Sequence, residues 1–266
     1  MTQTVIDQMG QEIPLPLHPK RIISLVPSQT ELLFDLGLDD EIIGVTRFCI
    51  HPADKTSSKV RIGGTKNFDI DMIKELKPDL IIGNKEENYE EGISELKKFF
   101  PVLMSDIYTL DDAYQMMTAI GKITNKQKEA DLLVKEIQSS FIDLSPATSQ
   151  PSPRSCAYFI WRKPYMVAAS GTFIDHMLGV FSVRNAFADL TRYPELTAEQ
   201  IAAAKLDFIF LSSEPYAFND KHIEEFKNIS PKSKVIIVDG ELFSWYGSRL
   251  RHTAAYFKDL RQSIFS

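Results

Sequence analysis

The sequence predicts an α/β protein built from two lobes, and three observations lead to this fold class. Short apolar runs rich in β-branched residues alternate with segments of helical periodicity, which is typical of parallel sheets covered by helices. The stretch 71–86 has a counterpart at 199–214, which indicates two homologous lobes. Between them, residues 110–144 contain no proline and keep apolar residues at helical spacing. We therefore expect two parallel-sheet lobes joined by one long backbone helix, with a ligand cleft between the lobes.

The internal repeat covers a helix, a strand and the residues after the strand. The first copy reads DMIKELKPDLIIGNKE and the second reads EQIAAAKLDFIFLSSE. Carboxylates occupy three matching positions, which are Asp71, Asp79 and Glu86 in the first copy and Glu199, Asp207 and Glu214 in the second. A second similarity pairs Thr30 and Gly37 with Thr172 and Gly179, seven residues apart in each case. Two similarities in the same order support duplication of one lobe.

The N-terminal lobe is expected at residues 1–108. Its first twenty residues are rich in proline and polar side chains, which predicts an extended lead-in with a short hairpin at Met9-Gly10. Strands are predicted at 21–26, 42–46, 80–83 and 102–104, and helices at 28–37, 69–76 and 90–100. The first helix follows Pro27, with Ser28 or Thr30 as its cap, and ends at Gly37.

The backbone helix is expected at 109–146, either unbroken or as two helices with a break near Thr124-Asn125. It leads into a linker at 145–153 whose prolines and serines prevent a continuous helix. The C-terminal lobe is expected at 147–266. Its predicted strands lie at 156–161, 208–211 and 235–238, and its predicted helices at 173–181, 199–204 and 248–263.

The composition is that of an ordinary folded protein with an acidic balance. The formal net charge of -6 and the pI near 5.5 argue against nucleic acid as a partner, because such binding requires a cationic surface. Cys49 and Cys156 lie far apart and in no zinc or disulfide pattern. The first twenty residues lack the features of a secretory signal, so we expect a chain that is cytosolic or supplied without its export signal.

Three segments point to a known family. Arg21–Glu31 reads RIISLVPSQTE, Leu76–Ile82 reads LKPDLII, and Trp245–Arg249 reads WYGSR. With the intervening backbone helix, this order resembles the helical-backbone substrate-binding proteins of ABC importers, which bind cobalamin, haem or iron siderophores. The cobalamin-binding branch looks closest, and the resemblance spans Lys20 to Leu260.

The resemblance implies a class III periplasmic-binding-protein-like fold and a binding role without enzymatic activity. The implied ligand is a cobalamin-like corrinoid or a ferric chelate such as a siderophore or haem, and no catalytic cofactor is expected. The implied partner is an ABC permease with its ATPase. The implied location is the periplasm or cell envelope, and we expect a monomer.

The resemblance also gives two of the repeated carboxylates a role. In this family one acidic residue on each lobe docks onto arginines of the permease, and the matching helix-start positions are Asp71 and Glu199. Two such carboxylates suit a symmetric basic partner. The alternative is that acidic residues are simply favoured in a first helical turn by the helix dipole.

Ligands of open parallel sheets lie beyond the carboxyl ends of the strands, so we searched those positions for binding residues. The candidates are Ser28, Phe48, His51, Lys66, Glu86, Trp161, Tyr165, Trp245, Tyr246 and Arg249. Aromatic walls suit a broad, flat chelate, although aromatic side chains near strand ends also close protein cores. Arg249 is expected to reach ligand oxygens or to pair with Glu86 or Glu214, the alternative being a surface arginine.

A metal site is a weaker hypothesis. Cys49 and His51 stand two apart on an extended segment, and Glu86 or Glu87 could complete the ligand set. His51 could instead supply an axial nitrogen to a metal already held in a macrocycle, or simply cap carbonyl groups of its loop. Lys66 stands where the cobalamin-binding relatives carry a tryptophan, and a cation there suits ligand carboxylates or phosphate.

Two other functions remain open at this stage. A tetrapyrrole chelatase would use His51 with Glu86 and Glu87, and no hydrolase, metalloprotease, dinucleotide or kinase motif competes with that reading. The other possibility is a cytosolic binding module with the same fold.

Overall fold

The computed structural model describes residues 2–142, 144 and 154–265. The predicted proline-serine linker at 145–153 lies outside the described residues. The chain divides into two compact units. Unit 1 comprises Met1–Ile107, Asp111–Gln138 and Tyr246–Arg251, and unit 2 comprises Tyr108–Leu110, Ser139–Trp245 and His252–Ser266. The segment expected as a separate connecting helix is therefore shared between the units.

Unit 1 is built on a five-stranded parallel sheet with the strand order β5-β4-β3-β8-β9. The strands are β3 (Ile22–Ser24), β4 (Ile42–Val45), β5 (Val60–Arg61), β8 (Leu80–Asn84) and β9 (Val102–Ser105). The strand order reverses between β3 and β8, so the carboxyl ends of these two strands form the switch point where ligands of such sheets bind. The predicted strands of this lobe are confirmed to within two or three residues.

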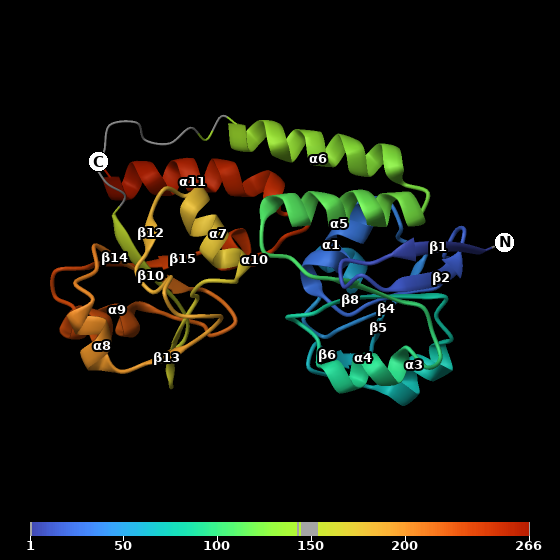
Figure 1. Cartoon of the computed structure of the whole chain (residues 1–266), viewed down its shortest axis with the longest axis horizontal. Helices are drawn as coiled ribbons and strands as arrows, with labels where there is room; N and C mark the ends of the chain where they lie inside the picture. Colours follow the sequence, from blue (N-terminus) through green and yellow to red (C-terminus); the bar gives the residue numbers. More distant parts are fainter. Residues whose placement is uncertain (1, 143, 145–153, 266) are drawn as a thin grey trace. The chain divides into compact units, whose positions relative to one another are not determined.

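Helices cover both faces of the unit 1 sheet. They are α1 (Pro27–Asp35), α2 (Ala53–Thr56), α3 (Ile70–Leu76), α4 (Glu90–Leu96) and most of α5 (Leu110–Ile123). In Figure 1, α1 and α5 lie on one side of the sheet and α3 and α4 on the other. This explains why the central strands β3 and β8 are buried along their whole length.

The N-terminal hairpin is present as predicted. The antiparallel strands β1 (Thr2–Ile6) and β2 (Glu12–Pro16) flank a turn in which Gly10 has a φ of 74°. Asp7 closes the turn, because one of its carboxylate oxygens accepts the N–H groups of Met9 at 2.9 Å and Gln11 at 2.8 Å. Two further short strands, β6 (Gly63–Gly64) and β7 (Asn67–Phe68), form a small antiparallel pair.

The long helical stretch is broken, which corrects the expectation of one unbroken helix and agrees with the alternative of a break near Thr124-Asn125. α5 ends at Ile123, and α6 (Gln127–Ile142) begins after three intervening residues. Asn125 adopts a φ of 59°, a left-handed conformation that ends a helix. A Cβ added to Gly121 would lie 2.4 Å from the Ala130 Cβ, so glycine permits α5 and α6 to approach closely.

Unit 2 has a six-stranded mixed sheet. Its strands are β10 (Ser155–Trp161), β11 (Tyr165–Val167), β12 (Arg184–Asn185), β13 (Glu195–Leu196), β14 (Phe208–Ser212) and β15 (Lys234–Val238). β10, β14 and β15 pair in parallel as the sequence predicts, and the short strand β12, which was not predicted, pairs in parallel with β10. β11 and β13 add an antiparallel edge that the sequence analysis missed, because strands of two or three residues carry too little periodicity to detect.

The helices of unit 2 also pack on both faces of their sheet. They are α7 (Phe173–Val180), α8 (Ala198–Ala203), α9 (Asp220–Ile229), α10 (Glu241–Ser244) and α11 (Leu250–Phe265), of which Leu250 and Arg251 belong to unit 1. Adjacent residues of β10 point to opposite faces. The Phe159 ring packs 4.6 Å from Phe226 of α9, and the Tyr158 ring packs 5.2 Å from Phe243 of α10. Burial of each such ring contributes roughly 1.5–3 kcal/mol.

The repeat at 71–86 and 199–214 is a true structural equivalence. Asp71 and Glu199 both occupy the second position of a short helix, α3 and α8. Both helices are followed by a lysine in the left-handed region, Lys77 with a φ of 48° and Lys205 with a φ of 49°. The shared spacing therefore reflects the same helix, the same helix ending and the same entry into a strand.

The second similarity does not mark equivalent positions. Gly37 has a φ of 72° and ends α1, whereas Gly179 lies inside α7. The residue that ends α7 in the left-handed region is Ser182, with a φ of 68°. Thr172 is the N-cap of α7, while Thr30 lies within α1. The two helices correspond, but the paired threonines are out of register by four residues at the helix start, and the paired glycines by three residues at the helix end.

Candidate functional site

The candidate site residues of unit 1 lie in loops at the carboxyl ends of its strands. Ser28 is buried in the first turn of α1, directly after β3. A Cβ on Gly247 would lie 2.3 Å from the Ser28 carbonyl oxygen, so the WYGSR segment passes directly over this turn. Only glycine permits so close an approach.

Buried amides hold the loop after β8. The side-chain oxygen of Asn84 accepts hydrogen bonds from the backbone N–H groups of Glu86 at 2.8 Å and Glu87 at 3.2 Å. These bonds shape the turn that carries both glutamates. The Asn88 side chain donates to the carbonyl oxygens of Thr65 at 3.0 Å and Leu25 at 3.3 Å. This amide therefore ties the loop to the end of β3 and to the glycine-rich loop before β7.

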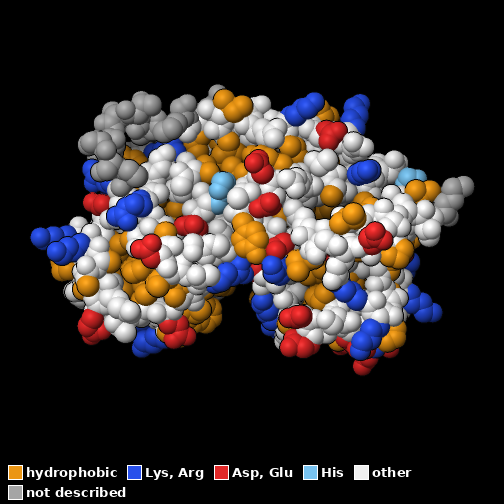
Figure 2. Space-filling view, in the orientation of Figure 1, with side chains coloured by type: hydrophobic (Ala, Val, Ile, Leu, Met, Phe, Trp, Pro, Cys, Tyr) orange, Lys and Arg blue, Asp and Glu red, His pale blue; other side chains and the backbone are white. Residues whose placement is uncertain are grey.

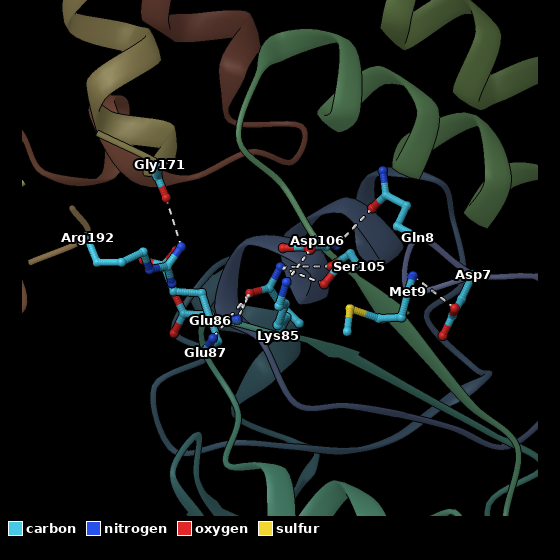
Figure 3. Close-up of polar contacts among 11 residues, drawn as sticks. Asp7, Gln8, Met9, Lys85, Glu86, Glu87, Ser105, Asp106, Gly171 and Arg192 are labelled. Carbon is cyan, nitrogen blue, oxygen red and sulfur yellow. Dashed lines mark hydrogen bonds and ion pairs between the residues drawn. The ribbon is translucent and has the colours of Figure 1, made fainter. Parts of the chain in front are cut away.

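The loop after β8 is also connected to the next strand. Asn84 donates to the Ser105 hydroxyl at 3.0 Å, and Lys85 forms an ion pair of 2.7 Å with Asp106 (Figure 3). The Asp106 N–H donates in turn to the Gln8 side chain of the hairpin at 3.2 Å. Lys66 reaches the same loop by donating to the Glu86 carbonyl oxygen. Lys66 and Glu86, predicted as ligand-binding residues, are thus brought together.

Phe48 is the exposed aromatic side chain of unit 1 at this edge. Its ring is 48% exposed, and the Arg47 guanidinium lies over it with 4.9 Å between the guanidinium carbon and the ring centroid. A Cβ on Gly64 would lie 3.2 Å from the Phe48 ring, so the ring rests against the glycine-rich loop. Arg47 and Phe48 together offer a flat apolar surface with a positive charge beside it.

Cys49 has a structural role. Its sulfur lies 3.1 Å from the Thr30 hydroxyl and 3.2 Å from the Thr46 hydroxyl, and burial raises the pKa of the thiol. Arg61 holds the same loop by donating to the carbonyl oxygens of Thr46 and Cys49. A buried thiol that stays protonated is a poor metal ligand.

The weak metal hypothesis gains no support. Residues 2–142, 144 and 154–265 contain no group of three or more histidine, cysteine, aspartate and glutamate side chains that could hold a metal ion. Cys49, His51 and Glu87 are therefore not brought together as a ligand set. His51 is partly buried and precedes Pro52 and α2.

Trp161 is the exposed aromatic side chain of unit 2 at the corresponding position. It is the last residue of β10, it is 39% exposed, and its ring packs edge-on against Tyr216 with 5.4 Å between centroids. Tyr216 follows β14, the neighbouring strand in the sheet. The two rings therefore form an aromatic surface at the switch point of this sheet.

Two polar side chains beside Trp161 meet on one carboxylate. Arg162 forms an ion pair with Glu225 of 2.6 Å between Nε and Oε2, and the Tyr165 hydroxyl donates to the other oxygen at 2.6 Å. Burial and the Glu225 carboxylate raise the pKa of Tyr165 to about 12. Burial opposes ionisation of Glu225, but the hydrogen bonds from Arg162 and Tyr165 have the larger combined effect, so the pKa of Glu225 is lowered. Tyr165 is thus held by α9 and is not free to rotate.

Trp245 is buried and bonded within unit 2. It is 7% exposed, and its indole N–H donates to Glu214 Oε1 at 2.9 Å, an oxygen that also accepts from the Ser244 hydroxyl at 3.0 Å. Burial raises the pKa of Glu214, although the hydrogen bonds from Ser244 and Trp245 oppose this. The contact joins the residue after β14 to the end of α10.

Arg249 pairs with a residue that the sequence analysis did not consider. Its guanidinium donates to both carboxylate oxygens of Glu31, at 2.9 and 2.6 Å, and both side chains are mostly buried. The two hydrogen bonds make this a two-pronged ion pair with α1, which the sequence analysis did not predict. Tyr246, the neighbour of Gly247, is also buried.

The two expected docking residues lie at matching exposed sites. Asp71 and Glu199 are both exposed at the second position of their helices. The helix of Asp71 begins with Asp69, whose side chain accepts the Met72 N–H at 2.9 Å. The helix of Glu199 begins with Thr197, and a hydrogen bond with this threonine lowers the pKa of Glu199. The Glu199 carboxylate thus stays ionised at neutral pH.

Two functional side chains, Glu31 and Glu225, escaped the sequence analysis. Glu31 carries no local signal, because its partner Arg249 lies 218 residues further along the chain. Glu225 could have been found through its helix, since Asn219 followed by apolar residues at helical spacing predicts a helix start that was overlooked.

The surface of the molecule is mixed in charge. On the face shown in Figure 2, basic and acidic side chains are interspersed, with hydrophobic side chains between them. None of the helices in the described part of the chain combines the length and the apolar character needed to cross a membrane.

Comparison with known proteins identifies the family. The sequence pattern of the periplasmic binding protein family matches residues 22–229, most of the chain. The chain belongs to this family. The predicted resemblance to substrate-binding proteins is thereby confirmed, and the family is one of binding proteins.

Individual relatives agree with this assignment. An uncharacterized ABC transporter substrate-binding lipoprotein, YvrC of Bacillus subtilis, is 30% identical over 77% of this chain and 68% of its own length. A vitamin B12-binding protein of Vibrio cholerae is 26% identical over 76% of this chain and 74% of its own. The solved structure of the petrobactin-binding protein YclQ of Bacillus subtilis has a TM-score of 0.81 at 20% identity, covering 97% and 98% of the two chains. The last likeness concerns the fold alone.

Proposed function

We propose that this protein is the substrate-binding component of an ABC importer and acts as a monomer at the cell envelope. The observation that carries this proposal is the family match over residues 22–229, joined by a relative described as an ABC transporter substrate-binding lipoprotein. The partner would be a permease with its ATPase. The role of the chain is binding and delivery, and it needs no catalytic cofactor.

The ligand in this proposal is a broad metal chelate, either a cobalamin-like corrinoid or a ferric chelate such as haem or a siderophore. Relatives described as binding vitamin B12 support the first class. The strand ends of each unit support a flat ligand with polar edges, because each presents an exposed aromatic ring beside an arginine. These pairs are Arg47 with Phe48 in unit 1 and Trp161 with Arg162 in unit 2.

The chemistry of Lys66 and Arg47 favours a ligand with acidic edges over a neutral one. Both cations follow strands of unit 1 at the edge where ligands of such sheets bind. Ser28, His51, Glu86 and the buried Tyr246 and Arg249 would shape this edge, and the buried Trp245 would shape the strand ends of unit 2. Three of these residues, Ser28, Trp245 and Arg249, are held by contacts within their own units. We therefore propose that they hold the site in shape and do not contact the ligand directly.

Docking on the permease is proposed for Asp71 and Glu199. Their support is the identical second position in equivalent helices, where an exposed carboxylate can meet an arginine of a symmetric partner.

Titration with cyanocobalamin, haemin and ferric siderophores tests the ligand. We expect an absorbance change with at least one of them, and Phe48→Ala and Trp161→Ala should each weaken binding by about 5- to 150-fold, since loss of an exposed ring costs about 1–3 kcal/mol. Phe99→Ala is the matched control, because Phe99 is 54% exposed at a different place in unit 1. Absence of binding to every chelate would refute the ligand class.

Charge reversal tests the docking residues. Asp71→Lys and Glu199→Lys should leave chelate affinity unchanged and reduce stimulation of the importer's ATPase more than tenfold. Glu90→Lys makes the same charge change at the exposed start of α4 and should have little effect. Equal inhibition by all three variants would indicate a general charge effect and would remove Asp71 and Glu199 from the interface.

A further inference from the structure

α9 contacts Tyr216 of the aromatic surface in unit 2 and the two polar side chains beside it, Arg162 and Tyr165. Glu225 of α9 binds Arg162 and Tyr165, and His222 of α9 contacts Tyr216, with 3.1 Å between Nε2 and the phenol oxygen. Tyr216 in turn packs against the exposed Trp161. One helix thus holds both the cation and the ring that supports the exposed aromatic side chain.

The hydrogen bonds of His222 fix its protonation state. Nδ1 accepts the N–H of Asn219, the N-cap of α9, at 2.9 Å. In the neutral ring the proton therefore lies on Nε2, which donates to the Tyr216 oxygen. His222 plays the part that glutamate or glutamine plays at the third position of a capping box.

A second proton cannot be accommodated without breaking this arrangement. Protonated Nδ1 is a donor, so it would face the Asn219 N–H as a second donor and the bond at the start of α9 would be lost. His222 is almost fully buried, and aromatic contacts with Tyr216 and Phe218 hold its ring. Adding a charge there would therefore displace the ring and the first turn of α9.

Some of the charged groups around His222 lower its pKa and one raises it. Arg162, at the end of β10, and Lys221, on α9, oppose protonation, while Glu225, one turn further along α9, favours it. Burial has the largest effect, and together with the two cations it lowers the pKa of His222 from its ordinary value of 6.5. The neutral form is therefore the one present at neutral pH.

We propose that α9 positions the ligand-facing groups Trp161 and Arg162, and that protonation of His222 releases them. The effect of this release on ligand binding rests on the proposed function. Acidification would loosen the start of α9, free Tyr216 from His222 and weaken the Glu225 anchor of Arg162. Ligand affinity would then fall as the pH falls, although the proton binds to His222 and not to a ligand-facing side chain.

Tryptophan emission of the ligand-free protein tests the release directly. Between pH 8 and pH 4.5 the wild type should show a transition with a midpoint below about 6.5. His222→Gln should lose most of this transition, because glutamine can keep both hydrogen bonds but does not titrate in this range. Trp161→Phe should lose it to the same extent, which separates Trp161 from Trp245, whose partner Glu214 also titrates. A transition of wild-type size in either variant, or a flat wild-type curve, would overturn the proposal.

Chelate affinity gives the second measurement. For whichever of haemin and cyanocobalamin binds the wild type, the affinity should fall at least threefold from pH 7.5 to pH 5, and His222→Gln should lose most of this dependence. An equal pH dependence in the variant would overturn the coupling to the ligand. If neither chelate binds at either pH, haem and cobalamin are excluded as ligands, and the emission experiment still decides whether His222 positions Trp161.

Discussion

Units 1 and 2 share their framework and differ at the edge where the strands end. In both units an aspartate at the strand entry binds the start of the neighbouring strand. Asp79 accepts the N–H groups of Lys20 at 2.8 Å and Arg21 at 2.9 Å, just before β3. Asp207 accepts both the N–H and the hydroxyl of Ser155 at 2.8 Å, at the start of β10.

At the opposite ends of the strands the chemistry diverges. Unit 1 fixes its loop with the neutral amides Asn84 and Asn88, whereas unit 2 uses the carboxylates Glu214 and Glu225. Neutral amides hold a loop at any pH, while carboxylates and their partners respond to pH. The comparison teaches that the duplicated part of the chain is the scaffold, and that the two ligand-facing edges have separate physical properties.

The largest expected effect comes from Gly247→Ala in unit 1. The new Cβ would lie 2.3 Å from the Ser28 carbonyl oxygen, a backbone atom that cannot move aside cheaply. We expect a loss of about 3 kcal/mol or more in the free energy of unfolding, measured by urea denaturation.

Gly179→Ala in unit 2 is the matched control for this substitution. Gly179 lies inside α7, and no atom lies within 4 Å of the added Cβ. Alanine should stabilise the helix by about 0.5–1 kcal/mol. If the two variants had similar stability, the tight packing of the WYGSR segment on α1 would be contradicted.

An intermediate effect is expected at the two strand-entry carboxylates. Asp79→Ala and Asp207→Ala each remove hydrogen bonds from a charged acceptor, so each should cost about 1–3 kcal/mol of unfolding free energy. Thermal or urea denaturation of both variants gives the comparison. A clear loss in one variant with none in the other would show that the repeat preserves the aspartate without preserving its role.

The smallest effect is expected when Glu214 is replaced by the kind of group that unit 1 uses. Because burial raises its pKa, the folded state holds the proton more tightly than the unfolded state, and the stability this gives at low pH is lost as the pH rises. Glu214→Gln keeps an oxygen for Trp245 and Ser244 without a charge. The melting temperature of the variant relative to that of the wild type should therefore increase as the pH rises from 5 to 8.

Glu224→Gln is the control for this pH series, since Glu224 is a largely exposed glutamate of α9. Its melting temperature should follow that of the wild type at every pH. If Glu214→Gln lowered the melting temperature relative to the wild type most strongly at high pH, the proposed cost of burying the Glu214 carboxylate would be contradicted.

Much of the fold could be predicted from local patterns. The strands at 80–83 and 208–211 and the helices at 69–76 and 199–204 were found because apolar periodicity and helix caps act over a few residues. The edge strands β11 and β13 were missed because two or three residues display no period. The break at Asn125 was one of two alternatives, and periodicity alone could not choose between them.

The sequence by itself determined the α/β class, the duplication and the family, since these depend on repeated local patterns of apolar and charged residues. Only the tertiary structure decided which side chains meet. Arg249 binds Glu31 from 218 residues away, Trp245 binds Glu214 from 31 residues away, and His222 caps α9 and also holds Tyr216. Such partners are chosen by the packing of distant elements, where a buried polar group must find a hydrogen bond wherever the fold offers one.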